Sequence, residues 1–157
     1  MSSGRDVLEH LYDAFGRADG PAMAACYAPD ARFSDPVYPE LSGAAVGAMW
    51  RMLTGRAQNL RIEVRDLQAD DSSGRATWLA TYLFGPARRP VANLVHSSFD
   101  LADGLITAQR DTFDFHAWAA QALGAKGRLL GWTPLVRNAV RAQAAKGLEA
   151  YLAAEST

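Results

Sequence analysis

The sequence predicts an α+β fold, with helices in the first third of the chain, strands in the middle and helices in the tail. In the first third, apolar residues recur at the three- and four-residue spacing of an amphipathic helix. In the middle, apolar and polar residues alternate, as in a sheet with one face in water. The length of 157 residues, 49% of them hydrophobic, suits one domain with a sizeable core.

Charge and composition exclude several classes of protein. A net charge of −1 offers no basic patch for nucleic acid, and Cys26 stands alone, so no internal disulfide can form. The three histidines, His10, His96 and His116, are not spaced as metal ligands. No apolar run reaches membrane-spanning length, and the first residues lack the pattern of a signal peptide. We therefore expect a cytoplasmic protein without a metal, cofactor, nucleic-acid or membrane partner.

The first third reads as two helices, a strand and a third helix. The first helix starts near Asp6, and residues 18–21 end it and begin a second helix, whose apolar face continues through Tyr27 to Pro29. A short strand over residues 31–36 follows. Residues 39–43 form a turn in which Ser42 is the expected N-cap of the third helix. The apolar residues of that helix are Val46, Met49, Trp50 and Leu53.

The middle of the chain predicts four strands, over residues 60–65, 75–84, 91–101 and 105–115. Turns separate them at residues 70–74 and 102–104. The last three strands are apolar on both faces. One face packs on the helices, and the other needs cover from a partner subunit or from the tail, so we expect a homodimer.

The tail, residues 119–157, is expected to be a helical extension of a main domain over residues 1–118. A helix over 117–123, a loop over 124–131 and a final helix from Pro134 make up this region. Five basic residues oppose two acidic ones from residue 119 onward, a pattern also found in helices that lie on membranes. The apolar side of the final helix is rich in alanine, however. We therefore favour packing on the body or on a second subunit, with Arg137 and Arg141 in water.

Two short runs, ARFSDP at 31–36 and ITAQRDTFDF at 106–115, each read as a strand that carries a carboxylate out of an apolar setting. A carboxylate in an apolar pocket has a raised pKa, which suits Asp35 and Asp111 to proton transfer near neutral pH. The structural alternatives are a turn cap for Asp35 and an ion pair with Arg110 or Arg32 for Asp111. Side chains alternate along a strand, so Arg110 should point away from Asp111.

The order of elements around these runs resembles the cone-shaped α+β superfamily typified by nuclear transport factor two. Residues 18–43, with the FSDP run, are similar to ketosteroid isomerases and SnoaL-like polyketide cyclases. Residues 106–115 are similar to the closing strand of limonene-epoxide hydrolases. The resemblance spans residues 6–118. It implies a cone-shaped α+β barrel, in which a curved mixed or antiparallel sheet wraps around the N-terminal helices, here with an extra C-terminal helix.

The resemblance also implies site residues. Asp35 falls at the proton-shuttling aspartate of the isomerases, whose oxyanion-hole tyrosine and protonated aspartate fall near Leu11 and Ser97. Asp111 falls at the water-activating aspartate of the epoxide hydrolases. Their other catalytic positions differ here, with Phe33 for a tyrosine, Asp35 for an asparagine, Ala80 for an arginine and Tyr82 for an aspartate. The residues that the superfamily turns toward its conical cavity are Phe33, Asp35, Trp78, Tyr82, Asn93, Val95, Ser97, Gln109, Asp111 and Phe113.

These residues support three hypotheses about function. In the first, a small, largely apolar ligand undergoes cofactor-free proton transfer beside a carbonyl, as in isomerisation or cyclisation, with Asp35 as base and Asp111 as a second acid or base. In the second, Asp111 holds a water that hydrolyses an epoxide. In the third, the protein is a non-catalytic ligand-binding or assembly module. The residues expected to hydrogen-bond the ligand are Tyr82, Asn93, Ser97 and Gln109.

Overall fold

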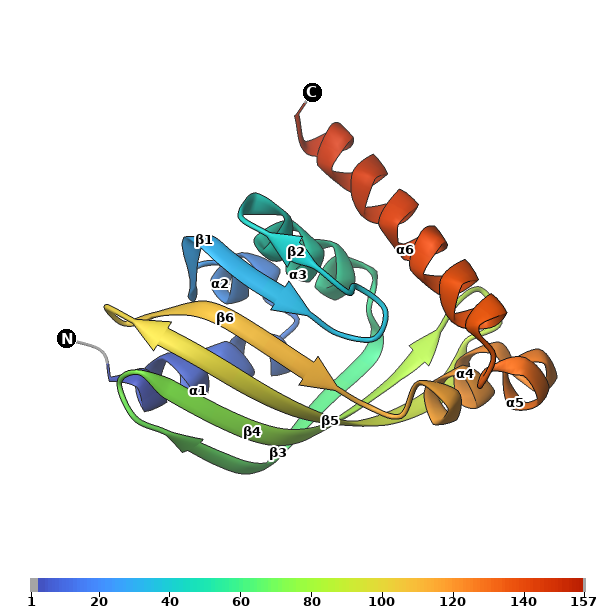
Figure 1. The fold of residues 1–157 in the computed structure, drawn as a ribbon, viewed down its shortest axis with the longest axis horizontal. Coiled ribbons are helices and arrows are strands. Elements are labelled where there is room, and N and C mark those ends of the chain that lie inside the picture. Colours follow the sequence, from blue (N-terminus) through green and yellow to red (C-terminus); the bar gives the residue numbers. More distant parts are fainter. Residues whose placement is uncertain (1–2, 157) are drawn as a thin grey trace.

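A computed structural model describes residues 3–156 and confirms the α+β prediction. A curved sheet wraps around the three N-terminal helices, and a long helix, α6, runs diagonally from the far end of the sheet to the C-terminus (Figure 1). The curvature gives the sheet a concave face, and the largest group of buried apolar residues lies between that face and the helices.

The N-terminal helices begin as the sequence predicts, and the second ends earlier. Helix α1 (Gly4–Gly16) starts with a capping box made by Ser3 and Asp6, and α2 (Gly20–Ala24) is capped by the Asp19 side chain. The expected continuation of the second helix through Tyr27 to Pro29 is wrong. Tyr27 instead begins strand β1 (Tyr27–Ser34), because pairing with strand β6 takes up the backbone there.

The turn before the third helix also differs in detail from the prediction. Ser42 does not cap a helix; it lies in the two-residue strand β2 (Leu41–Ser42) and pairs with Arg32 of β1. Gly43 is the N-cap of α3 (Ala44–Arg56), with φ of 64° and no side-chain cap. That backbone conformation favours glycine over the serine expected to cap the helix.

Six strands form one mixed sheet in the order β2-β1-β6-β5-β4-β3. The four long strands are β3 (Gln58–Ala69), β4 (Ser73–Phe84), β5 (Arg89–Ala102) and β6 (Leu105–Thr112). Strands β1 and β6 run parallel, and the other neighbours run antiparallel. The expected fourth long strand reaches only Thr112 instead of residue 115, because Asp114 caps the next helix through its side chain.

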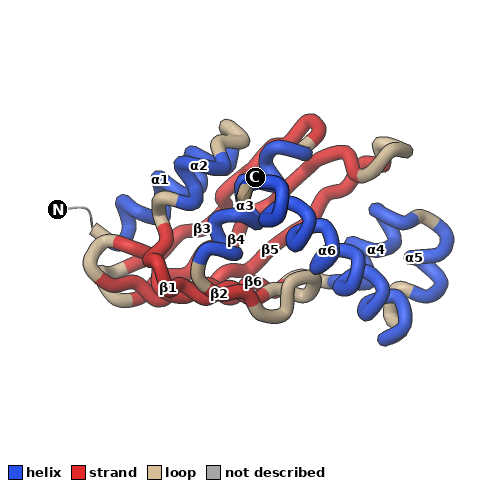
Figure 2. The backbone as a smooth tube through the Cα atoms, turned by 90° about the horizontal axis from the view of Figure 1, so that it is seen from above, coloured by secondary structure: helices blue, strands red, loops and turns tan. Residues whose placement is uncertain are grey.

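Three helices follow the sheet: α4 (Phe115–Leu123), α5 (Ala125–Leu130) and α6 (Pro134–Glu155). The loop expected over residues 124–131 is therefore wrong, since most of it is α5. Helices α4 and α6 form a second apolar cluster with strand β5, and Val37, Tyr82 and Phe113 pack against both clusters. Seen from above, α3 and α6 lie over the sheet (Figure 2).

Two arginines of α6 contact the protein, although they were expected in water. The Arg141 Nε donates to the carbonyl of Pro36 at 2.9 Å, and the Arg137 guanidinium lies 5.3 Å from the centre of the Phe115 ring. Near the C-terminus, Arg51 of α3 pairs with Glu155 of α6 at 2.8 Å. These contacts hold α6 on the body. Within residues 3–156, no helix is long and apolar enough to cross a membrane.

Candidate active site

A cavity of about 610 Å³ lies between the concave face of the sheet, helix α3 and the C-terminal helices. Its wall is mostly aromatic and aliphatic, which is typical of a site for a small organic molecule. The sequence-predicted site residues that line it are Asp35, Trp78, Tyr82, Asn93, Val95, Asp111 and Phe113. Both carboxylates therefore face one cavity, although 75 residues separate them in the chain.

Three predicted ligand-binding residues are not part of the cavity wall. Phe33 is 2%, Ser97 4% and Gln109 2% exposed, and all three lie beneath the surface that a ligand would touch. They belong to the shell that supports the wall. Ser97 and Gln109 both donate hydrogen bonds to Asp111. A direct contact of either residue with a ligand stays a prediction.

Asp35 is both a turn cap and a residue of the cavity wall, the two positions that the sequence left open. It follows the last residue of β1 and begins a turn, and its Oδ1 accepts hydrogen bonds from the backbone N–H groups of Val37 at 2.7 Å and Tyr38 at 2.6 Å. It also lines the cavity. Burial raises its pKa to about 6, although these two backbone hydrogen bonds and the charge of Arg141 oppose the rise. No described residue forms a hydrogen bond with its Oδ2.

Asp111 is 6% exposed and is held by two side-chain donors. The Ser97 hydroxyl, opposite it on β5, donates to Oδ1 at 2.6 Å. The Gln109 amide donates to Oδ1 at 3.0 Å and to Oδ2 at 3.2 Å. Burial and, to a smaller extent, the charge of Asp35 raise the pKa of Asp111 to about 7 against these bonds. The two carboxylates are therefore electrostatically coupled.

Two buried tryptophans fix the direction of the bonds to Asp111. Trp78 Nε1 donates to the Ser97 hydroxyl at 2.8 Å, so the single proton of Ser97 is left for Asp111. Trp50 Nε1 likewise donates to the Tyr27 hydroxyl at 2.9 Å, and that hydroxyl donates to Gln109 Oε1. The Gln109 amide must then turn its NH₂ group toward Asp111.

This network also decides which oxygen of Asp111 takes up a proton. Oδ1 accepts the two shortest hydrogen bonds, from Ser97 and Gln109, and is thereby kept as an acceptor. Oδ2 has only the longer contact with Gln109. A proton bound by Asp111 therefore resides on Oδ2, the oxygen that is less occupied by the protein.

The ion pairs considered for Asp111 are not formed. Arg110 points to the opposite face of β6, where it pairs with Asp100 at 3.1 Å, as strand alternation predicts. Among residues 3–156, no lysine, arginine or histidine makes an ion pair with Asp35 or Asp111. Buried carboxylates without a counter-ion hold protons more tightly, which is the physical basis of both raised pKa values.

Sequence reasoning missed the part of the wall that comes from helices. Helix α3 supplies Met49, Trp50 and Arg56, among others, and α4 and α6 supply Trp118, Val140 and Gln143. The Trp118 indole also donates to the Tyr82 hydroxyl at 2.8 Å, and so anchors one wall of the cavity to α4. The apolar periodicity of these helices was visible, but it marked them only as core.

Tyr12 lies behind Asp111 rather than in the cavity. It is 6% exposed, and its hydroxyl has no hydrogen-bond partner among the described residues. Burial raises its pKa, and the charge of Asp111 adds to the rise. The position expected for an oxyanion-hole tyrosine, near Leu11, thus supplies no group to the cavity wall.

Comparison with known proteins agrees with this architecture. The model of the SnoaL-like domain matches residues 8–109. A hypothetical Catenulispora acidiphila protein with a ketosteroid isomerase-like fold, in complex with trimethylamine, aligns with a TM-score of 0.68 and 14% identity over 82% of this chain and 98% of its own. An LEH-like epoxide hydrolase of M. tuberculosis aligns with a TM-score of 0.65 and 20% identity over 83% and 96%.

A third similar structure is TerC, crystallised with polyporic acid, with a TM-score of 0.64 and 14% identity over 75% of this chain and 96% of its own. At these identities the likeness shows the fold alone, which is described as ketosteroid isomerase-like or NTF2-like in the similar structures. No curated protein sequence matches the chain.

Proposed function

Because the chain belongs to the SnoaL-like domain family, we propose that it binds a small, largely apolar molecule in its cavity and moves a proton beside a carbonyl group of that molecule. The observation that carries the proposal is that Asp35 and Asp111 line one apolar cavity, each with Oδ1 occupied by the protein. Proteins of similar fold crystallised with trimethylamine and with polyporic acid support a small molecule as the ligand.

The two carboxyl groups suit different roles. With pKa values of about 6 for Asp35 and about 7 for Asp111, a pH between them leaves Asp35 largely ionised and Asp111 largely protonated. Asp35 then removes a proton from the carbon next to the carbonyl. Asp111 donates from Oδ2 to the carbonyl oxygen, where negative charge develops. Asp35 then gives its proton to another carbon while the enol oxygen returns its proton to Asp111, which re-forms the carbonyl, completes an isomerisation and restores both groups.

Asp111 can stand in for the oxyanion donor that the sequence lacks. The isomerase-like position for a protonated aspartate reads Ser97, and Ser97 is the cross-strand partner of Asp111 and donates to it. The carboxyl group that can donate to the oxyanion thus lies on β6 instead of on β5. Loss of an oxyanion donor typically costs about 100- to 1,000-fold in rate. Efficient proton transfer therefore requires Asp111 to take the role of the donor that is missing at Ser97.

Epoxide hydrolysis is the second candidate, and the bonds to Asp111 favour it. Donors from Ser97 and Gln109 stabilise an ionised Asp111, which above its pKa of about 7 could take a proton from a water. The oxygen of that water would attack an epoxide carbon as its carbon–oxygen bond breaks. The opened oxygen would take a proton from solvent, and Asp111 would release to solvent the proton that it removed. A non-catalytic binding module is the third candidate.

Deuterium exchange separates the three candidates. A panel of small apolar ketones in D₂O is followed by proton NMR, and we expect enzyme-dependent exchange at the carbon next to the carbonyl. Asp35→Asn should abolish exchange while ligand binding persists, and the exposed Asp100→Asn should exchange as the wild type does. Oxygen-18 from labelled water in a diol product would instead establish epoxide hydrolysis. Ligand binding without deuterium exchange and without epoxide hydrolysis would indicate a non-catalytic binding module.

We also propose that the protein forms a homodimer through the outer face of the sheet. Leu94 of β5, which is 39% exposed, lies there opposite Leu79 of β4. Light scattering that gives the mass of one chain at micromolar concentration would contradict this.

A further inference from the structure

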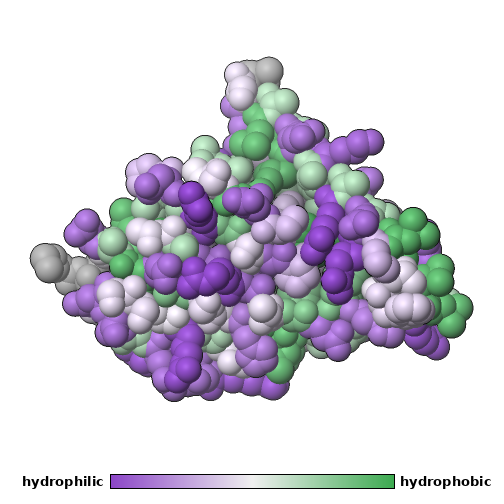
Figure 3. Space-filling view, in the orientation of Figure 1, coloured by the Kyte–Doolittle hydropathy of each residue, from purple (hydrophilic) through white to green (hydrophobic). Residues whose placement is uncertain are grey.

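Large apolar side chains gather at one end of the molecule, where α5 turns into α6. Leu129, Leu130, Trp132 and Leu135 are 69%, 44%, 68% and 75% exposed. We call these four residues the apolar corner. Figure 3 shows hydrophobic side chains over the end of the molecule that holds α5. Most apolar residues of this size are buried, so four together in solvent point to a partner.

The local structure holds this corner outward. Helix α5 packs on α4 through Gly127 and Gly131, where an added Cβ would collide with backbone or side chains of the neighbouring turn. With the glycine side against α4, Leu129 and Leu130 remain on the solvent side. The Trp132 indole donates to the Leu129 carbonyl at 3.1 Å, and Thr133 caps α6. The corner is therefore a defined feature of the fold.

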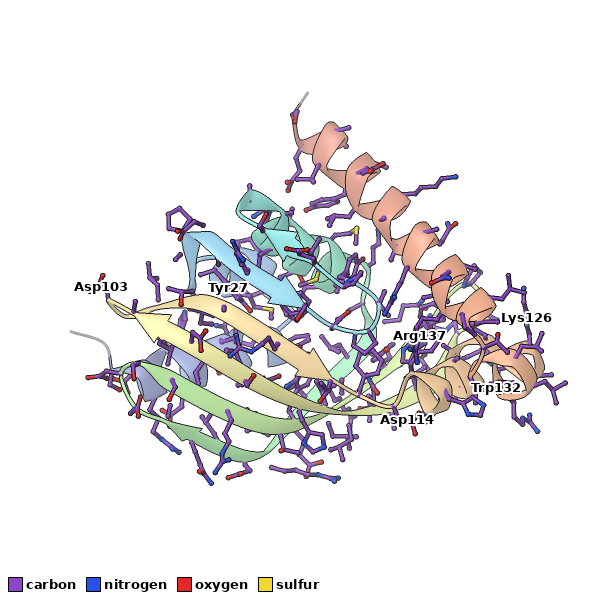
Figure 4. The ribbon with its side chains drawn as sticks, in the orientation of Figure 1. Tyr27, Asp103, Asp114, Lys126, Trp132 and Arg137 are labelled. Atoms are coloured by element: carbon purple, nitrogen blue, oxygen red, sulfur yellow. The ribbon has the colours of Figure 1, made fainter. Side chains whose placement is uncertain are left out.

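Charge around the corner has a single sign. Residues 115–148 contain five lysines and arginines and no aspartate or glutamate, whereas the rest of the chain holds 11 basic and 17 acidic residues. Lys126, Trp132 and Arg137 lie at the same end of the molecule (Figure 4). Lys126 and Arg128 precede the corner in the sequence and Arg137 follows it, so three of these positive charges flank the corner.

We propose that the apolar corner docks on the surface of an anionic lipid bilayer. Tryptophan and leucine insert at the boundary of headgroups and acyl chains, and nearby lysine and arginine are attracted to anionic lipids. A second copy fits less well, because a symmetric contact would bring two positive corners together. The expectation of no membrane partner rested on the alanine-rich side of α6. The bulky residues come instead from α5 and the turn after it.

Docking would place the cavity close to the bilayer. The cavity wall includes Trp118 and Leu123 of α4 and Val140 of α6, the two helices that flank the corner. A largely apolar ligand partitions into lipid, so a docked protein would meet its ligand at high local concentration. This last link rests on the proposed function, whereas the docking itself does not.

Flotation with vesicles tests the proposal directly. The full chain is mixed with vesicles of phosphatidylcholine alone or with phosphatidylserine, at about 0.1 M and about 1 M salt, across which the Debye length falls from ~10 Å to ~3 Å. We expect binding to the anionic vesicles and its loss at high salt. Trp132 is exposed and the other three tryptophans are at most 6% exposed, so a blue shift of fluorescence on binding reports on the corner.

Variants assign the binding to the corner. Leu129→Ser with Trp132→Ser should weaken binding about tenfold or more, because apolar insertion is lost. Lys126→Gln with Arg128→Gln should weaken it about 25-fold, since each charge near an anionic surface contributes about fivefold. Val64→Ser, at an equally exposed apolar site on β3, is the matched control and should bind normally. All five sites are exposed, and circular dichroism checks that each variant folds.

Three outcomes would overturn the proposal: no binding to anionic vesicles, equal binding by the corner variants, or self-association that Trp132→Ser abolishes. The last would assign the corner to a second copy. Asp35→Asn should float with vesicles as the wild type does. A failure of the proposed chemistry thus leaves the docking result intact, and a failure of docking leaves the chemistry intact.

Discussion

Replacing Asp111 with asparagine should stabilise the protein at neutral and alkaline pH. The pKa of Asp111 is raised from 3.8 to about 7 in the folded protein. Between these two values the folded state keeps a proton that the unfolded chain releases, so stability falls as the pH rises. Above about pH 7 both states are ionised, and the folded protein carries the full cost of a buried charge. About three pKa units correspond to ~4 kcal/mol, an upper estimate of that cost.

Asparagine suits this test because it has the shape of the protonated acid. Its Oδ1 can accept the hydrogen bonds from Ser97 and Gln109, and its NH₂ group takes the place of the protonated Oδ2. Asp111→Asn should therefore exceed the wild type in stability by up to ~4 kcal/mol near pH 8. The difference should fade toward pH 4, where the wild type is protonated as well.

Urea unfolding at several pH values measures this difference. The control is Asp100→Asn, which removes an exposed ion pair with Arg110 and should change stability by at most ~1 kcal/mol. If Asp111→Asn is less stable than the wild type at every pH, or if its advantage does not depend on pH, then Asp111 is an ordinary ionised carboxylate. The roles given to it above would then fail.

Three further substitutions test the surroundings of the carboxylates and the packing of α5. Ser97→Ala should raise the pKa of Asp111 by about one to two units, because a hydrogen bond to a charged group contributes ~1.5–3 kcal/mol; carbon-13 NMR of the carboxyl measures it. Arg141→Gln should raise the pKa of Asp35, whose charge Arg141 now stabilises, in the same experiment. Gly127→Ala should lower the melting temperature, because its Cβ would collide with a backbone carbonyl of α4.

Each of these substitutions has a matched control in the chain. Ser98→Ala, next to Ser97 but bonded to Arg110, should leave Asp111 unchanged. Arg137→Gln, one turn before Arg141 on α6, should leave Asp35 unchanged, since Arg137 stacks on Phe115. Gly55→Ala should be tolerated, because no atom lies within 4 Å of its added Cβ. Equal effects of a substitution and its control would contradict the contact assigned to it.

The fold class was predictable from the sequence, and so was the assignment of residues to the two faces of the last strand. Period-two alternation placed Asp111 on one side of β6 and Arg110 on the other, and the structure confirms this. Alternation acts within one strand, however. It does not say which residue of β5 lies opposite Asp111, so the bond from Ser97 followed only from the register.

Other features depended on contacts between distant segments. Tyr27 continues a helical pattern, yet pairing with β6 draws it into β1, where its hydroxyl orients Gln109. Helix α5 was not predicted because glycines such as Gly127 and Gly131 are typical of loops. Their close packing on α4 is the reason that glycine occupies these positions. The helical wall of the cavity was missed for the same reason, since a core face and a pocket face share one apolar pattern.

Asp35 and Asp111 should both change protonation near neutral pH inside one cavity. Carbon-13 NMR of the aspartate carboxyl groups between pH 3 and 9 tests it most directly, with Asp35→Asn and Asp111→Asn to assign the two signals. The expected midpoints are about 6 for Asp35 and about 7 for Asp111, and that of Asp111 should fall when Asp35→Asn removes the neighbouring charge. Midpoints near 4 for both groups, unaffected by each other's removal, would contradict the account.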